Sequence, residues 1–107
     1  MILATHLSLT EERSPDGLVV HARGEVDAST ASQFADALSK AADTPEGDLI
    51  VDLSRVEFMD VKGFAALLNA HRKAGDAGRK MIVVCPSGQV RRMLGLLDTS
   101  GRLSLIP

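Results

Sequence analysis

The sequence predicts a single α/β domain over residues 1–107, with helices packed on one mixed β-sheet. Its length suits one domain, and its composition, 45% hydrophobic and 24% charged, is that of a globular protein. Segments with the apolar patterns of strands and helices follow one another in the order β-β-α-β-α-β-α-β. Two successive strand-helix-strand units imply parallel neighbours joined by right-handed crossovers, and the opening pair of strands makes the sheet mixed.

Two strands are predicted at the start of the chain, over residues 3–9 and 18–24. The leucines of the first segment share one face at a period of two, which marks a half-buried strand: Leu3, Leu7 and Leu9. Residues 15–17, Pro-Asp-Gly, predict a turn because proline presets φ and glycine accepts positive φ. The two strands are therefore expected to form a hairpin.

A helix is predicted after the second strand. Its apolar residues recur at helical spacing and draw one stripe: Ala31, Phe34, Ala35, Leu38, Ala41 and Ala42. Thr30, with Gln33 three residues later, resembles a capping box at its start. Pro45 and Gly47 are expected to end it. The nearly continuous apolar run over residues 48–54 predicts a strand that is central in the sheet or covered on both faces.

A second helix is predicted after Asp60, ending at Gly75 or Gly78. Its apolar face carries residues at helical spacing: Phe64, Leu67, Leu68, His71 and Ala74. Residues 80–85 then predict another strand.

The third helix is expected to be capped by Ser87 and to end at Gly101. Its apolar residues repeat at three and four: Val90, Met93, Leu94 and Leu97. Residues 102–106 predict a final strand at an edge of the sheet.

Composition excludes several classes of function. The net charge of −2 and the presence of three Phe with no Trp or Tyr argue against nucleic-acid binding, which needs a basic surface and stacking platforms. Cys85 is the only cysteine, so no internal disulfide is expected. The first ten residues do not resemble a signal peptide, and no apolar run approaches the ~20 residues of a membrane span. A cytoplasmic domain is expected.

No cofactor or metal is expected either. The chain has neither of the two common glycine-rich phosphate loops. Its three histidines, His6, His21 and His71, show no ligand spacing and are interpreted as surface or core-margin residues.

Residues 24–30, with the sequence GEVDAST, join the second strand to the first helix. Two interpretations are open for Asp27 and Ser29. The loop could be an acidic surface that a partner meets, or Asp27 or a following hydroxyl could cap the helix through its side chain, a contact worth ~1 kcal/mol.

Residues 85–91 have the Cys-x-x-Gly-x-x-Arg spacing of phosphatases that attack phosphoesters with a cysteine thiolate. Arg91 would then clamp the phosphate oxygens. Against this interpretation, Pro86 removes a backbone donor from the phosphate cradle. Arg92 stands where such enzymes generally use a hydroxyl residue, and free cysteine is among the most buried residue types.

Residues 58–63, FMDVKG, form a strand-to-helix turn with Asp60 as the predicted N-cap and Gly63 where backbones come close. Lys62 lies in the first turn of the helix, where a cation costs ~0.3–1 kcal/mol against the helix macrodipole. The turn by itself offers no structural reason for a lysine.

Residues 24–38, 48–87 and 90–103, taken together with the order of elements, resemble the STAS domain family. The resemblance is greatest to its small stand-alone bacterial members, the anti-sigma factor antagonists, and runs from Leu3 to Ile106. It implies a STAS-like domain with a mixed sheet of four to five strands and three main helices. It also implies that the chain binds a protein rather than catalysing a reaction.

Family antagonists dock onto an anti-sigma factor, usually a kinase of the histidine-kinase-like ATPase fold, and free the sigma factor that it holds. The kinase then phosphorylates a Ser or Thr at the start of the second helix and ends the interaction. The family motif there is similar to Asp-Ser-Ser/Thr-Gly, with the second hydroxyl as acceptor. Here Asp60 and Gly63 match that motif, whereas Val61 and Lys62 replace both hydroxyls.

The resemblance thus implies a cytoplasmic bacterial module that regulates transcription by partner switching and lacks the usual phosphorylation switch. The expected partner-binding residues lie in two loops: Asp27, Ser29, Asp60, Val61, Lys62 and Gly63. Ser29, Thr30 and Ser54 are alternative phosphate acceptors.

Two other functions stay open. The chain could be a STAS subunit of a membrane lipid-transport complex, binding a transporter ATPase or permease. It could also be a phosphatase acting through Cys85 and Arg91.

Overall fold

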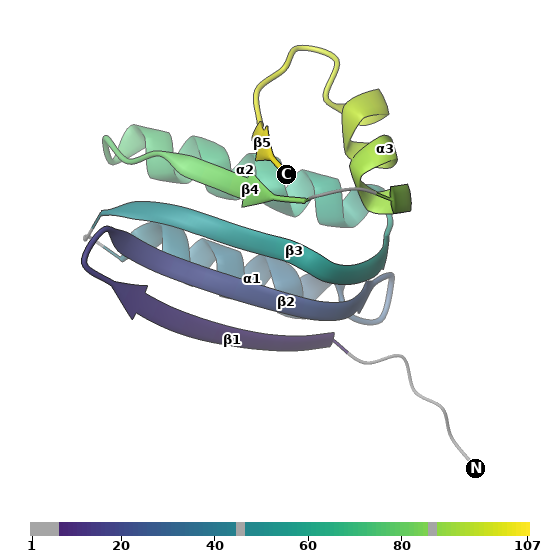
Figure 1. Cartoon of the computed structure of the whole chain (residues 1–107), viewed down its shortest axis with the longest axis horizontal. Coiled ribbons are helices and arrows are strands. Elements are labelled where there is room, and N and C mark those ends of the chain that lie inside the picture. Colours follow the sequence, from purple (N-terminus) through teal and green to yellow (C-terminus); the bar gives the residue numbers. More distant parts are fainter. Residues whose placement is uncertain (1–6, 45–46, 86–87) are drawn as a thin grey trace.

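The protein is described by a computed structural model that covers residues 7–44, 47–85 and 88–107. These residues form one five-stranded sheet and three helices (Figure 1). The elements have these bounds: β1 Leu7–Ser14, β2 Gly17–Val26, α1 Ala31–Asp43, β3 Asp48–Met59, α2 Val61–Asp76, β4 Met81–Val84, α3 Gly88–Leu97 and β5 Ser104–Ile106. The predicted order of elements and the α/β fold class are confirmed.

The sheet has the strand order β1-β2-β3-β4-β5. β1 pairs with β2 antiparallel, and every other pair is parallel, so the sheet is mixed as predicted. β3 is central, and β5 forms an edge, also as predicted. Right-handed crossovers place consecutive helices on the same face of a parallel sheet, and α1 and α2 accordingly lie side by side behind it (Figure 1).

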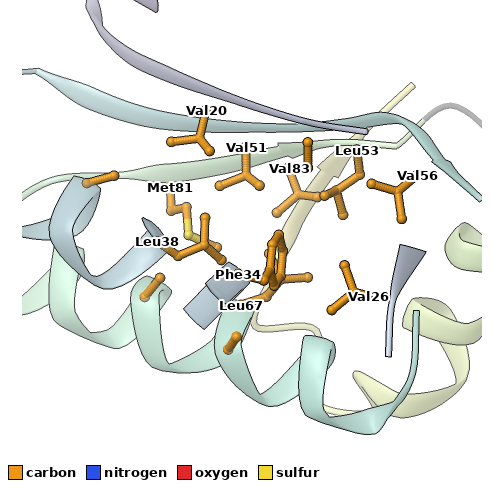
Figure 2. Close-up of a cluster of buried hydrophobic side chains, with 14 of the residues drawn as sticks. Val20, Val26, Phe34, Leu38, Val51, Leu53, Val56, Leu67, Met81 and Val83 are labelled. Atoms are coloured by element: carbon orange, nitrogen blue, oxygen red, sulfur yellow. The ribbon is translucent and has the colours of Figure 1, made fainter. Parts of the chain in front are cut away.

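The hydrophobic core fills the space between these two helices and the sheet. Phe34 of α1 and Leu67 of α2 are fully buried and lie beneath the strands (Figure 2). Val20, Val51 and Val83 reach toward them from three neighbouring strands (Figure 2). Because side chains alternate along a strand, the residues that follow these valines face away from α1 and α2 and are only partly buried.

The predicted turn at residues 15–17 is confirmed, and it joins β1 to β2. Gly17 has φ +151°, and a Cβ there would lie 2.0 Å from the carbonyl oxygen of Asp48. The position therefore requires glycine, and it holds the start of β2 against the start of β3.

The first strand extends further along the chain than the leucine pattern predicted. β1 is described over Leu7–Ser14, so the prediction is confirmed at residues 7–9 and its end at residue 9 is wrong, whereas residues 3–6, with Leu3, lie outside the described residues. The strand continues through exposed charged residues at 11–13. The edge strand β1 is held in the sheet by its backbone hydrogen bonds to β2. Positions that face solvent therefore need no apolar side chains, and the apolar pattern does not mark the full length of the strand.

The predicted capping box is wrong. Thr30 is the N-cap of α1 but makes no capping bond with its side chain. Its hydroxyl donates to the carbonyl of Glu25, 2.8 Å away, and Gln33 donates to the carbonyl of Leu7 at 3.2 Å. Both side chains therefore tie α1 to the sheet.

The end of α2 agrees with the prediction: it ends at Asp76, and Gly78 follows with φ +76°. The predicted end of the third helix at Gly101 is wrong, because α3 already ends at Leu97. Pro45 and Ser87, the expected stop and cap of the other two helices, lie outside the described residues.

Candidate functional site

The two loops that carry the predicted site residues meet at one end of the sheet. β2 and β3 are parallel neighbours, so the helices that follow them both begin at the carboxyl ends of these strands. The N–H of Asp60 donates to the carbonyl of Val26, 3.0 Å away. This bond joins the turn at residues 60–63 to the residue that precedes Asp27.

Asp60 is the N-cap of α2, as predicted. Its Oδ1 accepts hydrogen bonds from the backbone N–H groups of Lys62 at 3.0 Å and Gly63 at 3.2 Å. The Asp60 carboxylate therefore bonds to the backbone N–H of Lys62 and not to its ammonium group. The ammonium group can contact solvent or a partner.

Replacing Asp60 by alanine is expected to lower the free energy of unfolding by about 1 kcal/mol, because two N–H groups lose their acceptor. Asp60→Ser should recover most of the loss. Asp36→Ala, on the exposed side of α1, is the control and should change the free energy of unfolding by less than about 0.5 kcal/mol. Urea unfolding measures all three variants. Equal losses of unfolding free energy in Asp60→Ala and Asp36→Ala would contradict a capping role for Asp60.

Gly63 allows α2 to start close to the sheet. It is buried, and a Cβ at this position would lie 2.4 Å from Cγ of Met59 and 3.0 Å from Cγ1 of Val26. The expected close approach at Gly63 is therefore to the side chains of Met59 and Val26, not to another backbone. Since neither contact has room for a methyl group, the position of the exposed residues Val61 and Lys62 depends on this glycine.

Lys62 lines a groove of about 420 Å³ between α1 and α2, which we name the α1–α2 groove. Small residues form the rest of its lining: Ala28, Ala31, Ser32, Ala35, Ala65, Ala66 and Asn69. Within the described part of the chain, the ammonium group has no hydrogen-bond or ion-pair partner. Val61, the residue before Lys62, is 61% exposed. Its side chain supplies exposed apolar surface next to this cation in the chain.

Asp27 organises the neighbouring loop. Its Oδ1 accepts from the hydroxyl of Ser29 at 2.7 Å and from the N–H of Ser29 at 2.9 Å. The Ser29 hydroxyl, more than any other group, lowers the pKa of Asp27 below its usual value, so the carboxylate is ionised at neutral pH. The interpretation that a side chain of this loop caps α1 is wrong. The backbone N–H groups of Thr30 and Ala31 donate instead to the main-chain carbonyl of Asp27.

The alternative phosphate acceptors differ in access. Thr30 is 5% exposed and its hydroxyl is engaged with Glu25, so it cannot meet a kinase. Ser29 is exposed in the Asp27 loop, and Ser54 is exposed on β3. Residues 60–63 contain no hydroxyl.

Cys85 has the environment of a structural residue. It is 1% exposed, and burial raises the pKa of its thiol despite the opposing charge of Arg91. The Arg91 guanidinium donates to the carbonyl of Cys85 at 2.7 Å. A nucleophilic cysteine needs the opposite, a lowered pKa and access. Pro86 and Ser87, the first residues of the proposed cradle, lie outside the described residues.

A charged cluster that sequence reasoning missed lies on the sheet face opposite α1 and α2. His21 bonds through Nδ1 to Asp52 and through Nε2 to Glu12, both at 2.8 Å. The bonds to Glu12 and then Asp52 raise the pKa of His21. Burial tends to raise the pKa of Asp52, but bonds from Ser54 and His21 outweigh it, and the pKa of this carboxyl is lowered.

The His21 cluster is expected to stabilise the fold below neutral pH. The pKa of His21 is higher in the folded protein than its unfolded value of about 6.5, so the cluster stabilises the fold fully below about pH 6.5. This stabilisation is lost as the pH rises through the pKa that His21 has in the folded protein. The imidazole is 40% exposed, so the effect stays below about 1 kcal/mol. Urea unfolding of wild type and His21→Gln should show a larger difference at about pH 5.5 than at about pH 8.5. A difference in unfolding free energy between wild type and His21→Gln that does not change with pH would contradict this role of the His21 cluster.

No helix among the described residues is both long enough and apolar enough to cross a membrane.

The chain matches a known protein family, and solved structures share its fold. The sequence model of the STAS domain matches residues 8–106. An anti-sigma factor antagonist from Mycobacterium paratuberculosis is 26% identical, with a TM-score of 0.87 over 95% of this chain and 86% of that one. The Bacillus cell fate determinant SpoIIAA in its phosphorylated form is 20% identical, with a TM-score of 0.69 over 94% of this chain and 92% of that one.

A transporter also contains the fold. The murine Solute Carrier 26 family member A9 anion transporter is 19% identical, with a TM-score of 0.71 over 90% of this chain but 17% of that chain. The same fold thus occurs in stand-alone proteins and within a much longer one.

Proposed function

Because this chain belongs to the STAS domain family, we propose that it is an anti-sigma factor antagonist that docks on an anti-sigma factor and releases the bound sigma factor. The anti-sigma factor is expected to have the histidine-kinase-like ATPase fold, and the process to be regulation of transcription in a bacterial cytoplasm. The similarity to a stand-alone antagonist over nearly the whole chain supports this role. Fold alone does not assign function, so the proposal rests on the surface around Lys62.

That surface has the composition of a protein interface. The exposed side chain of Val61 and the alanines of the α1–α2 groove supply apolar area, and Lys62 supplies a charge beside it. Interfaces combine such an apolar centre with a polar rim. A stable complex buries about 800 Å² on each partner, more than the groove offers, so the neighbouring Asp27 loop is included in the proposed docking surface.

Lys62 distinguishes this chain from antagonists that carry the family's phosphate acceptor. It occupies the position of the phosphate acceptor in the family motif, and residues 60–63 offer no other hydroxyl. Lysine cannot accept phosphate from such a kinase, and its charge is opposite to that of phosphoserine. Two consequences are open: either the antagonist is always competent to bind the usual anti-sigma factor, or Lys62 pairs with an acidic surface of a different partner.

Lys62→Ser is expected to create a phosphate acceptor. The new hydroxyl would lie in the first turn of α2, where free N–H groups and the helix dipole favour a phosphate. With the cognate kinase and radiolabelled ATP, the variant should be labelled at residue 62, and wild type should remain unlabelled. Labelling of wild type, at Ser29 or elsewhere, would contradict the absence of a switch.

A pull-down from the source organism's lysate tests the class of partner. Wild-type bait should enrich a histidine-kinase-like anti-sigma factor, identified by mass spectrometry. Lys62→Glu bait should lose it. Lys40→Glu, an exposed lysine in the last turn of α1 and so at the far end of that helix, is the matched control and should retain it.

A second candidate function is a STAS subunit of a membrane lipid-transport complex. The missing phosphate acceptor favours it, since a transport subunit needs no kinase switch, and the fold occurs within an anion transporter. In the same pull-down, capture of a transporter ATPase or permease would establish this function instead.

We propose no catalytic role for Cys85. Its burial and raised thiol pKa support this view. Hydrolysis of an aryl phosphate that is lost in Cys85→Ser would overturn it.

A further inference from the structure

The sheet face opposite α1 and α2 carries a groove of about 620 Å³, which we name the sheet-face groove. Hydroxyl side chains line it from β1 and β3: Ser8, Thr10 and Ser54. Arg23 of β2 and Arg55 of β3 also line it. It is a different surface from the proposed docking site, and none of its lining residues belongs to the α1–α2 groove.

A bulge in β3 brings the two arginines together. β2 advances two residues from His21 to Arg23, while β3 advances three from Asp52 to Arg55, and the register shifts between these pairs. Ser54 and Arg55 are consequently both exposed, although neighbours in a regular strand point to opposite faces. Bulges re-aim side chains in this way and are frequent beside functional sites.

The arginine pair lacks a counter-ion. Arg23 and Arg55 are direct partners in the parallel register, and within the described residues neither forms a hydrogen bond or ion pair through its side chain. Like charges directly opposite each other destabilise a sheet. A pair of this kind gains stability when an anion binds between the two guanidinium groups.

The neighbouring carboxylates do not supply that anion. Asp52 also lines the groove, but its Oδ2 contacts His21 and its Oδ1 accepts from the N–H of Ser54 at 2.9 Å. Glu12 contacts the other nitrogen of His21. Glu57 is exposed in an adjoining groove with both arginines and forms no ion pair with either.

We propose that the sheet-face groove binds the phosphate group of a small phosphomonoester, clamped by Arg23 and Arg55. A guanidinium fork binds phosphate through two parallel N–H···O bonds. Two forks offer more donors than the two oxygens of one carboxylate can accept, and a phosphate dianion balances both charges. The hydroxyls of Ser8, Thr10 and Ser54 add donors, and a groove of about 620 Å³ leaves room for the rest of a small ligand.

NMR titration of the ¹⁵N-labelled full chain tests the site. Inorganic phosphate and, in a second arm, glycerol phosphate are added at fixed pH and constant ionic strength. Saturable shifts are expected at the amides of Arg23, Ser54 and Arg55 with both probes, and tighter binding of glycerol phosphate would show that the groove also contacts the organic part. Arg55→Gln and Arg55→Lys should each weaken binding at least about tenfold, since the lysine keeps the charge but loses the fork.

The control is Arg92→Gln, an exposed arginine of α3, which should bind as wild type does. Shifts that do not saturate, or that persist unchanged in the Arg55 variants, would indicate an adventitious ion only and overturn the proposal.

Thermal unfolding gives an independent readout. Without phosphate at low ionic strength, Arg55→Gln should raise Tm by about 1–4 °C, because the repulsion between the paired arginines is removed. Phosphate should then raise the Tm of wild type more than that of the variant. A lower Tm for Arg55→Gln in phosphate-free buffer would assign Arg55 a structural role and contradict the proposal.

Discussion

Replacing Phe34 by alanine is expected to lower the free energy of unfolding by about 3–5 kcal/mol. The ring is fully buried between α1, α2 and the sheet, where Figure 2 shows it close to Leu67. Its removal loses the transfer free energy of a large apolar side chain and leaves a cavity that the surrounding strands cannot fill. Since domains are stable by only about 5–15 kcal/mol, the variant should be close to unfolding at growth temperature. Urea unfolding followed by circular dichroism measures the loss.

Phe58→Ala is the matched control, because it removes the same ring from a position that is 36% exposed. We expect a smaller loss of about 1–2 kcal/mol for this variant. Similar losses in the two variants would mean that the core is not centred on Phe34.

Lys62→Glu is expected to weaken the affinity for the anti-sigma factor by about 10–100-fold. The change places a carboxylate where Lys62 is proposed to face an acidic group of the partner, and like charges in an interface are strongly unfavourable. Lys62→Gln, which removes the charge without reversing it, should give a smaller loss. Isothermal titration calorimetry with the purified partner measures both.

Lys40→Glu makes the same charge change at the other end of α1 and should leave the affinity within about twofold of wild type. If Lys62→Glu and Lys40→Glu reduce affinity equally, the effect is one of net charge, and the docking surface lies elsewhere.

The order of elements followed from hydrophobic periodicity, because the helices and the inner strands bury one face each. The stripe through Phe34 and Leu38 predicted α1, and the apolar run at residues 48–54 predicted the central strand β3. Asp60 was also predictable as a cap, since its carboxylate acts on N–H groups two and three residues away. Short-range interactions of this kind are visible in the sequence.

Interactions between distant segments were not predictable in the same way. Thr30 and Gln33 have the spacing of a capping box, yet their side chains bond to Glu25 and Leu7, and only the packing of α1 on the sheet brings these groups together. The bulge that pairs Arg23 with Arg55 depends on the register of two strands, which no local pattern specifies. The sheet-face groove was therefore missed, whereas the Lys62 turn was found through its departure from a family motif.

Release of a sigma factor is the activity that defines an antagonist, and a titration of the sigma complex measures it. A fluorescently labelled sigma factor is bound to its anti-sigma factor, and this chain is added in the presence of ATP while anisotropy is recorded. We expect anisotropy to fall to the value of free sigma factor and to stay there, since residues 60–63 carry no acceptor through which the kinase could reverse the exchange. Anisotropy that remains at the bound value when the chain is in large excess would contradict the antagonist function.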